Sequence, residues 1–471
     1  MRRLQKTLRR IELATRPVNP EVATALERVW SELPDHVRVE KQTMGRHTTA
    51  CEGTHGVFPK CDFGCTPCYH SKEANLVRID GDHTVREVDR QMAYMRKRRG
   101  PGQYAQLIGG EVSLLTPEDH ARALQTMVGH DRKPMSFTHG DFDYEYLRAL
   151  AVDENDEPRF KHLSFAGHFD TTMVGRRGIK RPETERELNP FRECFCEMFN
   201  RLESEYGITH YLAHNMTVTG SNVEQIPDVI RECRQLGWRL FSHQPAAFVG
   251  NPTRWQEDSR ELTNERVWEQ IETAAGVRLP YKAIQVGDER YNRSVWGFYA
   301  GDRYVPLLDD QHPGDMKARD GFFKSIGGMD FYAPTSLVAL RLARAALSNP
   351  SVVLPTASWG ARLLRRAGVG NLRRGPVKAM TFTLHAFMDA DDVKPAWDLL
   401  QKNEMSDDPR IRTTQERLQA CAYGMAHPDS DLIVPACVQH SALDPLEIES
   451  LREELPLRPR QPKRRLDLIS S

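Results

Sequence analysis

The chain lacks an excess of charge of either sign. Its 471 residues contain 65 Lys and Arg against 65 Asp and Glu, so nothing in the overall charge predicts nucleic-acid binding. It also lacks any apolar run long enough to cross a bilayer, and we expect no transmembrane segment. Repeats of solenoid length and long low-complexity segments are missing too. The length predicts two or three units of structure with a large core.

Cysteine is scarce, and the nine cysteines do not form the pattern of a disulfide framework. We therefore expect a soluble protein of a reducing, cytoplasmic compartment. Three of the nine, however, lie together as C-x3-C-x2-C, at Cys61, Cys65 and Cys68. Three thiolates on one short loop can converge on one point, and thiolate is the usual protein ligand of iron–sulfur clusters. Three ligands leave one iron of a four-iron cube uncovered.

Other uses of three cysteines fit the pattern less well. A structural zinc site takes four ligands, commonly from two C-x2-C pairs, and this stretch contains one such pair. Disulfides do not suit the expected reducing compartment. We favour a [4Fe–4S] cluster. A non-catalytic iron–sulfur or zinc-binding protein remains the alternative.

From Phe58 onward, short apolar runs alternate with amphipathic helical segments. The runs near 104–108, 134–138, 163–170, 209–218 and 238–242 read as strands, and with the unit that begins at Phe58 they give six βα units. This pattern predicts an α/β fold, a partial (β/α)6 TIM-like barrel with an α-rich C-terminal extension. In such folds the functional groups collect where strands end. The polar residues at these ends that we take as candidates for substrate contact are His139, His168, Asp170, His214 and His243.

A second motif, Gly109-Gly110-Glu111, directly follows one of these strands. Paired glycines let a bound molecule approach the backbone closely. Together with the cysteine loop, the motif resembles the radical S-adenosylmethionine (SAM) superfamily. Further similarities are Thr138-His139-Gly140, the run 163–167, and Thr217 to Thr219 with Asn222, so that the resemblance covers about residues 55 to 250.

The resemblance implies both cofactors and a reaction. Cys61, Cys65 and Cys68 would hold a [4Fe–4S] cluster whose open iron binds SAM. An electron from a flavodoxin-type or ferredoxin-type donor would cleave SAM to methionine and a 5′-deoxyadenosyl radical, which takes hydrogen from an unactivated C–H bond. The residues implied in SAM binding are Gly109, Gly110 and Glu111 near the methionyl amino group, Ser164 at the ribose, and Tyr69 and Asn222. Pro67 departs from the family, in which an aromatic residue usually precedes the third cysteine.

The C-terminal part resembles one subgroup of that superfamily, which includes tetraether lipid synthases and pterin-methylating relatives. The similarity rests on His385, Phe387, Asp389, Cys421 and Cys437. The substrate class therefore stays open between lipid, pterin and peptide. Cys421, Cys437 and His440 are candidates for an auxiliary metal site, although ordinary packing is our preferred interpretation of these three.

The chain is expected to divide into five parts. These are an N-terminal helical extension (1–50), the radical SAM core (51–250), a core completion with a hairpin (251–330), a C-terminal domain (331–457) and a disordered basic tail (458–471). The first sixteen residues carry six Arg or Lys. They are compatible with weak association with an anionic membrane surface, although a solvated helix is the simpler interpretation.

Overall fold

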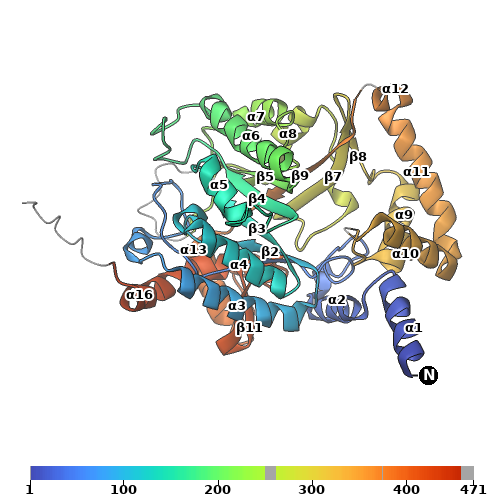
Figure 1. Cartoon of the computed structure of the whole chain (residues 1–471), viewed down its shortest axis with the longest axis horizontal. Coiled ribbons are helices and arrows are strands. Elements are labelled where there is room, and N and C mark those ends of the chain that lie inside the picture. Colours follow the sequence, from blue (N-terminus) through green and yellow to red (C-terminus); the bar gives the residue numbers. More distant parts are fainter. Residues whose placement is uncertain (1, 250–260, 332, 374, 458–471) are drawn as a thin grey trace, which may run out of the picture.

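A computed structural model describes residues 2–249, 261–331, 333–373 and 375–457 (Figure 1). Its strands form one sheet of eleven, in the order β11-β10-β1-β2-β3-β4-β5-β6-β9-β7-β8. The strands are β1 (Cys51–Gly53), β2 (Gln103–Leu107), β3 (Arg132–Thr138), β4 (His162–His168), β5 (Thr209–Val218), β6 (Leu240–Pro245), β7 (Asn292–Ala300), β8 (Arg303–Pro306), β9 (Lys378–His385), β10 (Tyr423–His427) and β11 (Leu432–Pro435). The predicted tail, 458–471, lies outside the described residues.

The helices account for much of the remaining chain. Those before β7 are α1 (Arg2–Thr15), α2 (Pro20–Glu32), α3 (Gly81–Arg99), α4 (Pro117–Gly129), α5 (Tyr144–Ala151), α6 (Asn189–Tyr206), α7 (Ile226–Cys233) and α8 (Asn264–Ala275). Those after β8 are α9 (Pro313–Ile326), α10 (Thr335–Ser348), α11 (Val353–Ala367), α12 (Val369–Leu372), α13 (Ala390–Leu400), α14 (Pro409–Gln419), α15 (Ala436–Val438) and α16 (Asp444–Glu454).

Strands β2 to β6 confirm the predicted βα order, whereas β1 lies before Phe58, where the alternation was expected to begin. Strands β1 to β6 are neighbours in sequence order, pair in parallel, and are followed in turn by helices α3 to α8. The sheet curls into an open half-barrel with these helices packed on its outside (Figure 1). The α/β class and the partial-barrel fold are therefore as predicted.

The C-terminal part lengthens this sheet at both edges, which we did not predict. Strand β9 pairs in parallel with β6, and β10 pairs in parallel with β1. The predicted hairpin around Gly301 is confirmed as β7 and β8, and Gly301 adopts the positive φ of +60° that its turn requires. Residues far apart in the sequence thus extend the half-barrel beyond its first and its sixth strand.

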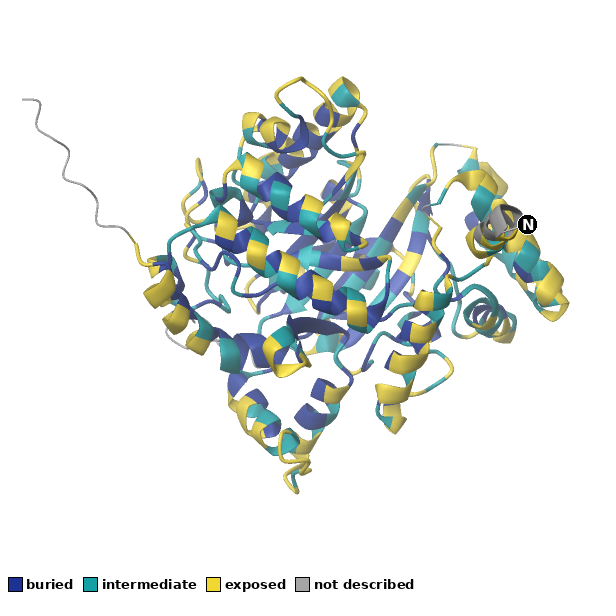
Figure 2. Cartoon of the chain, turned by 60° about the horizontal axis from the view of Figure 1, so that its bottom comes forward, coloured by how far each residue is buried: buried dark blue, intermediate teal, exposed yellow. Residues whose placement is uncertain are grey.

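The two faces of the sheet differ in chemistry. Leu212, Phe241 and Phe382 are fully buried on the face that the helices cover. Because side chains alternate along a strand, their neighbours Ser242 and Thr383 lie on the concave face, where they are half-buried. Figure 2 shows strands that are mostly buried or intermediate inside helices with exposed outer sides. The concave face is therefore polar and partly open.

Among the described residues, no single helix is long and apolar enough to cross a membrane. Residues Thr335–Ser348 and Pro350–Ala367 meet that test only as a pair, and the pair is bent by 103°.

Candidate functional site

The cysteine loop follows β1 and lies against the glycine pair that follows β2. The Gly110 amide donates to the Phe58 carbonyl (2.7 Å), and the Glu111 amide donates to the Lys60 carbonyl (2.9 Å). A Cβ atom on Gly110 would lie 2.1 Å from the Lys60 carbonyl oxygen. The glycine is therefore required because the backbone of the cysteine loop itself fills this space.

The loop is held on its other side by the segment after β4. Gly64 donates its amide to the Val174 carbonyl (2.8 Å), and Thr66 donates to the Thr172 carbonyl (3.0 Å). None of the nine cysteines, all within the described residues, forms a disulfide, and the three loop cysteines are partly exposed. Burial, together with the nearby Glu111 carboxylate, raises the pKa of the Cys61 thiol. Three accessible thiols on one fixed loop form a donor set that suits an iron–sulfur cluster.

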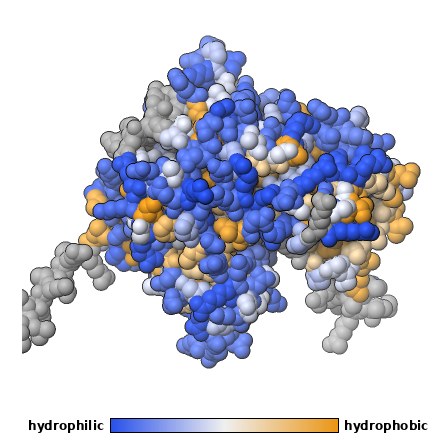
Figure 3. Space-filling view, turned by 90° about the horizontal axis from the view of Figure 1, so that it is seen from above, coloured by the Kyte–Doolittle hydropathy of each residue, from blue (hydrophilic) through white to orange (hydrophobic). Residues whose placement is uncertain are grey.

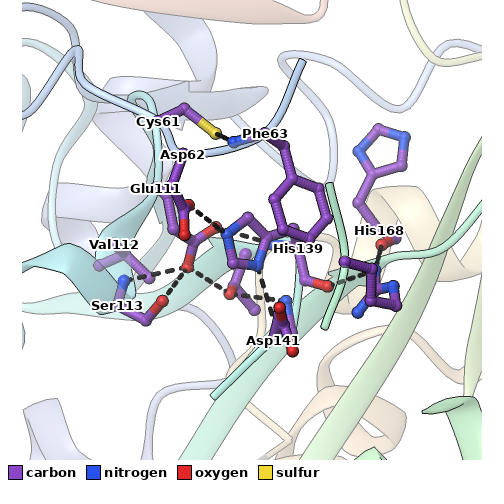
Figure 4. Close-up of polar contacts among 12 residues, drawn as sticks. Cys61, Asp62, Phe63, Glu111, Val112, Ser113, His139, Asp141 and His168 are labelled. Atoms are coloured by element: carbon purple, nitrogen blue, oxygen red, sulfur yellow. Dashed lines mark hydrogen bonds and ion pairs between the residues drawn. The ribbon is translucent and has the colours of Figure 1, made fainter. Parts of the chain in front are cut away.

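His139, at the end of β3, reaches the same loop (Figure 4). Its ring stacks on Phe63 with the centroids 3.9 Å apart, and its Nε2 lies 2.9 Å from the Asp62 carboxylate. The hydrogen bond from His139 lowers the pKa of Asp62. Ligand atoms of Cys61, Asp62 and His139 all lie within 4.8 Å of one another. The loop therefore also presents a mixed set of metal ligands.

Glu111 is buried, and its carboxylate joins the ends of two strands. Its Oε1 accepts hydrogen bonds from the Ser113 amide (3.0 Å), the Ser113 hydroxyl (2.7 Å) and the Thr138 hydroxyl (2.6 Å). Its Oε2 accepts from the His139 amide (2.8 Å). These partners assign Glu111 a role in shaping the site. Its contact with the amino group of SAM stays a prediction.

His168 and Asp170 lie side by side at the end of β4. His168 Nε2 lies 3.1 Å from the Asp170 carboxylate and 3.2 Å from the Thr217 hydroxyl, and its side chain is 34% exposed. Burial alone would raise the pKa of Asp170, but the hydrogen bond and charge of His168 outweigh it, and this pKa is lowered. By strand alternation His168 shares the concave face with Ser164, whose hydroxyl lies 3.2 Å from His162 Nε2. These residues can present polar groups to a bound molecule.

Two predicted substrate residues lie on the opposite face of the sheet. His214 Nε2 accepts a hydrogen bond from Arg192 of α6 (3.0 Å), and its ring lies 5.2 Å from that of Trp238. His243 shares the helix-covered face with Phe241 by alternation and is fully buried. Burial lowers the pKa of His214 well below its usual value and that of His243 to about 4. The structure therefore does not bring these two histidines to the concave face, because a polar strand end alone does not say which face its side chain takes.

The remaining predicted cofactor residues have internal partners. The Tyr69 hydroxyl donates to the Gly109 carbonyl (2.6 Å). Asn222 is buried, accepts from the Thr219 amide (2.8 Å) and donates to the Glu185 carboxylate (3.1 Å). The contacts of Tyr69 and Asn222 with SAM stay predictions.

Cys421, Cys437 and His440, the candidates for an auxiliary metal site, are not among the described triplets whose ligand atoms lie close together. The Cys421 thiol donates to the Tyr423 carbonyl (3.1 Å), Cys437 is buried in an apolar cluster, and His440 Nδ1 lies 2.7 Å from the Asp444 carboxylate. In the part of the chain that the structure describes, two other triplets have ligand atoms within 4.8 Å: the loop set above, and His55, His427 and Glu447.

Residues 436–456, here called the C-terminal clasp, pack on the cysteine loop, a contact that we did not predict. The Tyr69 ring lies 4.1 Å from that of His440, and His70 Nδ1 lies 3.8 Å from the Asp444 carboxylate. Burial alone would raise the pKa of Asp444, but the charge of His440 and its hydrogen bond lower it to about 2. The clasp therefore brings a carboxylate that is charged at neutral pH close to the cysteine loop.

Arg176 is a second residue that we did not predict. It is buried, it donates to the His139 carbonyl (2.7 Å), and its guanidinium carbon lies 4.6 Å from the centre of the Phe169 ring. Burial lowers its pKa to about 10. It lies in the loop after β4, where one arginine among several carries no sequence signal of its own.

No family model matches the sequence, and no curated protein matches it. Among solved structures, the chain is similar to Streptococcus suis SuiB bound to S-adenosylmethionine, with 14% identity, 49% of this chain and 48% of that chain covered, and a TM-score of 0.35. It is similar to anSMEcpe with bound AdoMet and the Cp18Cys peptide (14% identity, 48% and 58% covered, TM-score 0.33). It is also similar to TYW1 with a lysine-pyruvate adduct bound (9% identity, 52% and 81% covered, TM-score 0.33). The chain thus spans about half the length of SuiB, and likeness of this extent assigns neither family nor activity.

Proposed function

We propose that the chain is a radical SAM enzyme in which Cys61, Cys65 and Cys68 hold a [4Fe–4S] cluster. The observation that carries the proposal is the pairing of two motifs. The cysteine loop and Gly109-Gly110-Glu111 are separate in sequence, yet they hydrogen-bond to each other at the carboxyl ends of the parallel strands β1 and β2. This is the edge where α/β folds bind their ligands.

When bound, the cluster and SAM supply a 5′-deoxyadenosyl radical that abstracts hydrogen from an unactivated C–H bond. The chain's own residues position the reacting groups. Tyr69 fixes the Gly109 carbonyl, and Glu111 fixes the ends of β2 and β3. His168 Nε2 lies against the Asp170 carboxylate, and this contact fixes the ring at the edge of the concave face. An electron donor of the flavodoxin or ferredoxin type is part of this proposal.

The polar concave face supports a substrate that carries polar groups beside the reacting carbon. Ser164, Ser242 and Thr383 lie half-buried on this face and offer hydroxyl groups to such a molecule. A lipid headgroup, a pterin and a peptide all meet this description.

A second candidate function is the binding of a single metal ion by Cys61, Asp62 and His139. Their proximity favours it. The hydrogen bonds of His139 oppose it, because its Nδ1 accepts from the Asp141 amide (3.0 Å). A neutral imidazole that accepts at Nδ1 carries its proton at Nε2, so the nitrogen facing Asp62 has no free lone pair for a metal. We therefore place the cluster account first.

The test is SAM cleavage by anaerobically reconstituted, reduced protein, measured as 5′-deoxyadenosine by chromatography. We expect the nucleoside from the wild type and from Cys194→Ala, which removes an exposed cysteine outside the site. We expect none from Cys65→Ala. If the wild type forms no 5′-deoxyadenosine although it carries its cluster, the proposed activity is wrong.

A further inference from the structure

One part of the chain has charge of a single sign. Residues 331–388 contain no Asp or Glu, although the whole chain has as many acidic as basic residues. The basic residues in this range are Arg341, Arg344, Arg362, Arg365, Arg366, Arg373, Arg374 and Lys378. The range begins just before α10 and ends after β9, so most of it forms the helices α10 to α12. We call these three helices the basic arm.

The outer side of the basic arm is apolar as well as basic. Leu347 at the end of α10 is 84% exposed, and Leu354 at the start of α11 is 80% exposed. Exposed residues recur at helical spacing in both helices, as Leu340, Ala343 and Leu347 in α10 and Leu354, Ala361 and Leu364 in α11. Figure 3 shows hydrophobic atoms gathered at the right edge of the molecule, where Figure 1 places these helices. Contiguous exposed apolar surface of this kind marks a binding face.

The described arginines between α10 and β9 divide into two groups. Arg362 and Arg366 point to the body of the protein and both pair with the buried Asp315 of α9, at 2.7 and 2.6 Å. Arg365 and Arg373 are exposed. The first group fixes the arm to the molecule, and the second adds positive charge to the apolar surface.

The end of α1 joins the same edge. Arg341 of α10 donates to the Ala14 carbonyl (3.1 Å), and Arg344 donates to the Thr15 hydroxyl (2.9 Å). Ile11 and Leu13, on that end of α1, are exposed. The apolar edge is therefore built from two distant parts of the sequence.

We propose that the basic arm docks on the surface of an anionic lipid bilayer. Exposed leucines beside arginines, on helices that carry no acidic residue, are the composition of helices that lie in the bilayer interface. Glu12 of α1, next to the arm, is paired with Arg344 at 3.2 Å. The 103° bend between α10 and α11 suits a hairpin that lies on the surface rather than one that crosses. A second copy of the chain would bring the same positive face, and like charges would oppose that pairing.

The test is co-sedimentation of the full-length protein with vesicles. We expect binding to phosphatidylcholine vesicles that contain phosphatidylglycerol, weaker binding at high salt, and little binding to phosphatidylcholine alone. Because Leu347→Glu with Leu354→Glu removes two exposed leucines from the docking face and adds two negative charges, it should weaken binding by about tenfold or more. Both side chains are too exposed for this change to affect folding.

The matched control is Leu446→Glu in α16, which is 64% exposed. Figure 1 places α16 at the other end of the molecule from α11, so this variant should bind like the wild type. Cys65→Ala should also bind normally, which separates this proposal from the radical SAM activity. No wild-type binding, or equal binding by the double variant, overturns the proposal. So does self-association that the double variant abolishes without any vesicle binding.

Discussion

The Tyr69 hydroxyl donates a hydrogen bond to the Gly109 carbonyl across 2.6 Å and so joins the end of the cysteine loop to the glycine pair. Tyr69→Phe removes this bond and leaves the carbonyl unpaired. We expect the free energy of unfolding to fall by about 0.5–1.5 kcal/mol, the net value of one such bond. Urea denaturation measures this loss. An unchanged midpoint would mean that the two segments are held together without Tyr69.

Gly110→Ala tests the close approach of the same two segments. The new methyl group would lie 2.1 Å from the Lys60 carbonyl oxygen, so the loop must shift. We expect a loss of ~1–3 kcal/mol in stability and a marked loss of iron after reconstitution. Gly129→Ala is the control, since nothing lies within 4 Å of its added Cβ. Normal iron content in Gly110→Ala would contradict this account of the glycine.

Asp170→Asn tests the buried carboxylate beside His168 at the end of β4. The Asp170 carboxylate accepts from the Thr172 amide and from the Thr217 amide, both at 2.9 Å, and an amide side chain cannot accept on both sides. We expect ~1–3 kcal/mol of destabilisation. The pKa of Asp170 is lowered in the folded state, so this carboxylate stabilises the protein at every pH above its usual pKa of 3.8. The stability is lost as the pH falls through the folded-state pKa. Denaturation of Asp170→Asn should therefore be less sensitive to acid; equal sensitivity in both proteins would refute this role.

The clasp should loosen as the pH rises. Burial acts to lower the pKa of His55, but the Glu447 carboxylate, 2.9 Å away, outweighs it and the pKa is raised. Because the folded-state pKa of His55 is raised, its contribution to stability is fully present at a pH below its usual pKa of 6.5. That contribution is lost as the pH rises through the folded-state pKa. Amide exchange in residues 436–456, corrected for its intrinsic pH dependence, should speed up on the alkaline side. Glu447→Gln should abolish that difference, and pH-independent protection in the wild type would contradict the prediction.

The local elements could be predicted because their signals are local. Thr116 caps α4 through the Asp119 amide (3.1 Å), as expected from a threonine before a helical apolar pattern. The run 104–108, apolar and followed by two glycines, forms β2 nearly where we expected it. The cysteine loop was found from its spacing, and the glycine pair from its place after a strand and its resemblance to a known motif.

The contacts that complete the site depend on residues far apart in the sequence, and periodicity does not encode them. Nothing local indicates that β10 pairs with β1, or that His440 reaches the Tyr69 ring. His214 has the same polar character as His168, and only the alternation of the folded strands separates the covered face from the concave one. Arg176 is recognised as part of the site only from the structure, by its hydrogen bond to the His139 carbonyl.

The metal content of matched variants tests the central claim most directly. We predict about four irons and four sulfides per chain in the reconstituted wild type, as for a [4Fe–4S] cluster. Asp62→Asn should retain them, and Cys68→Ala should lose them. The opposite pattern, with about one zinc per chain that Asp62→Asn loses and Cys68→Ala keeps, would show a single-ion site and contradict the account.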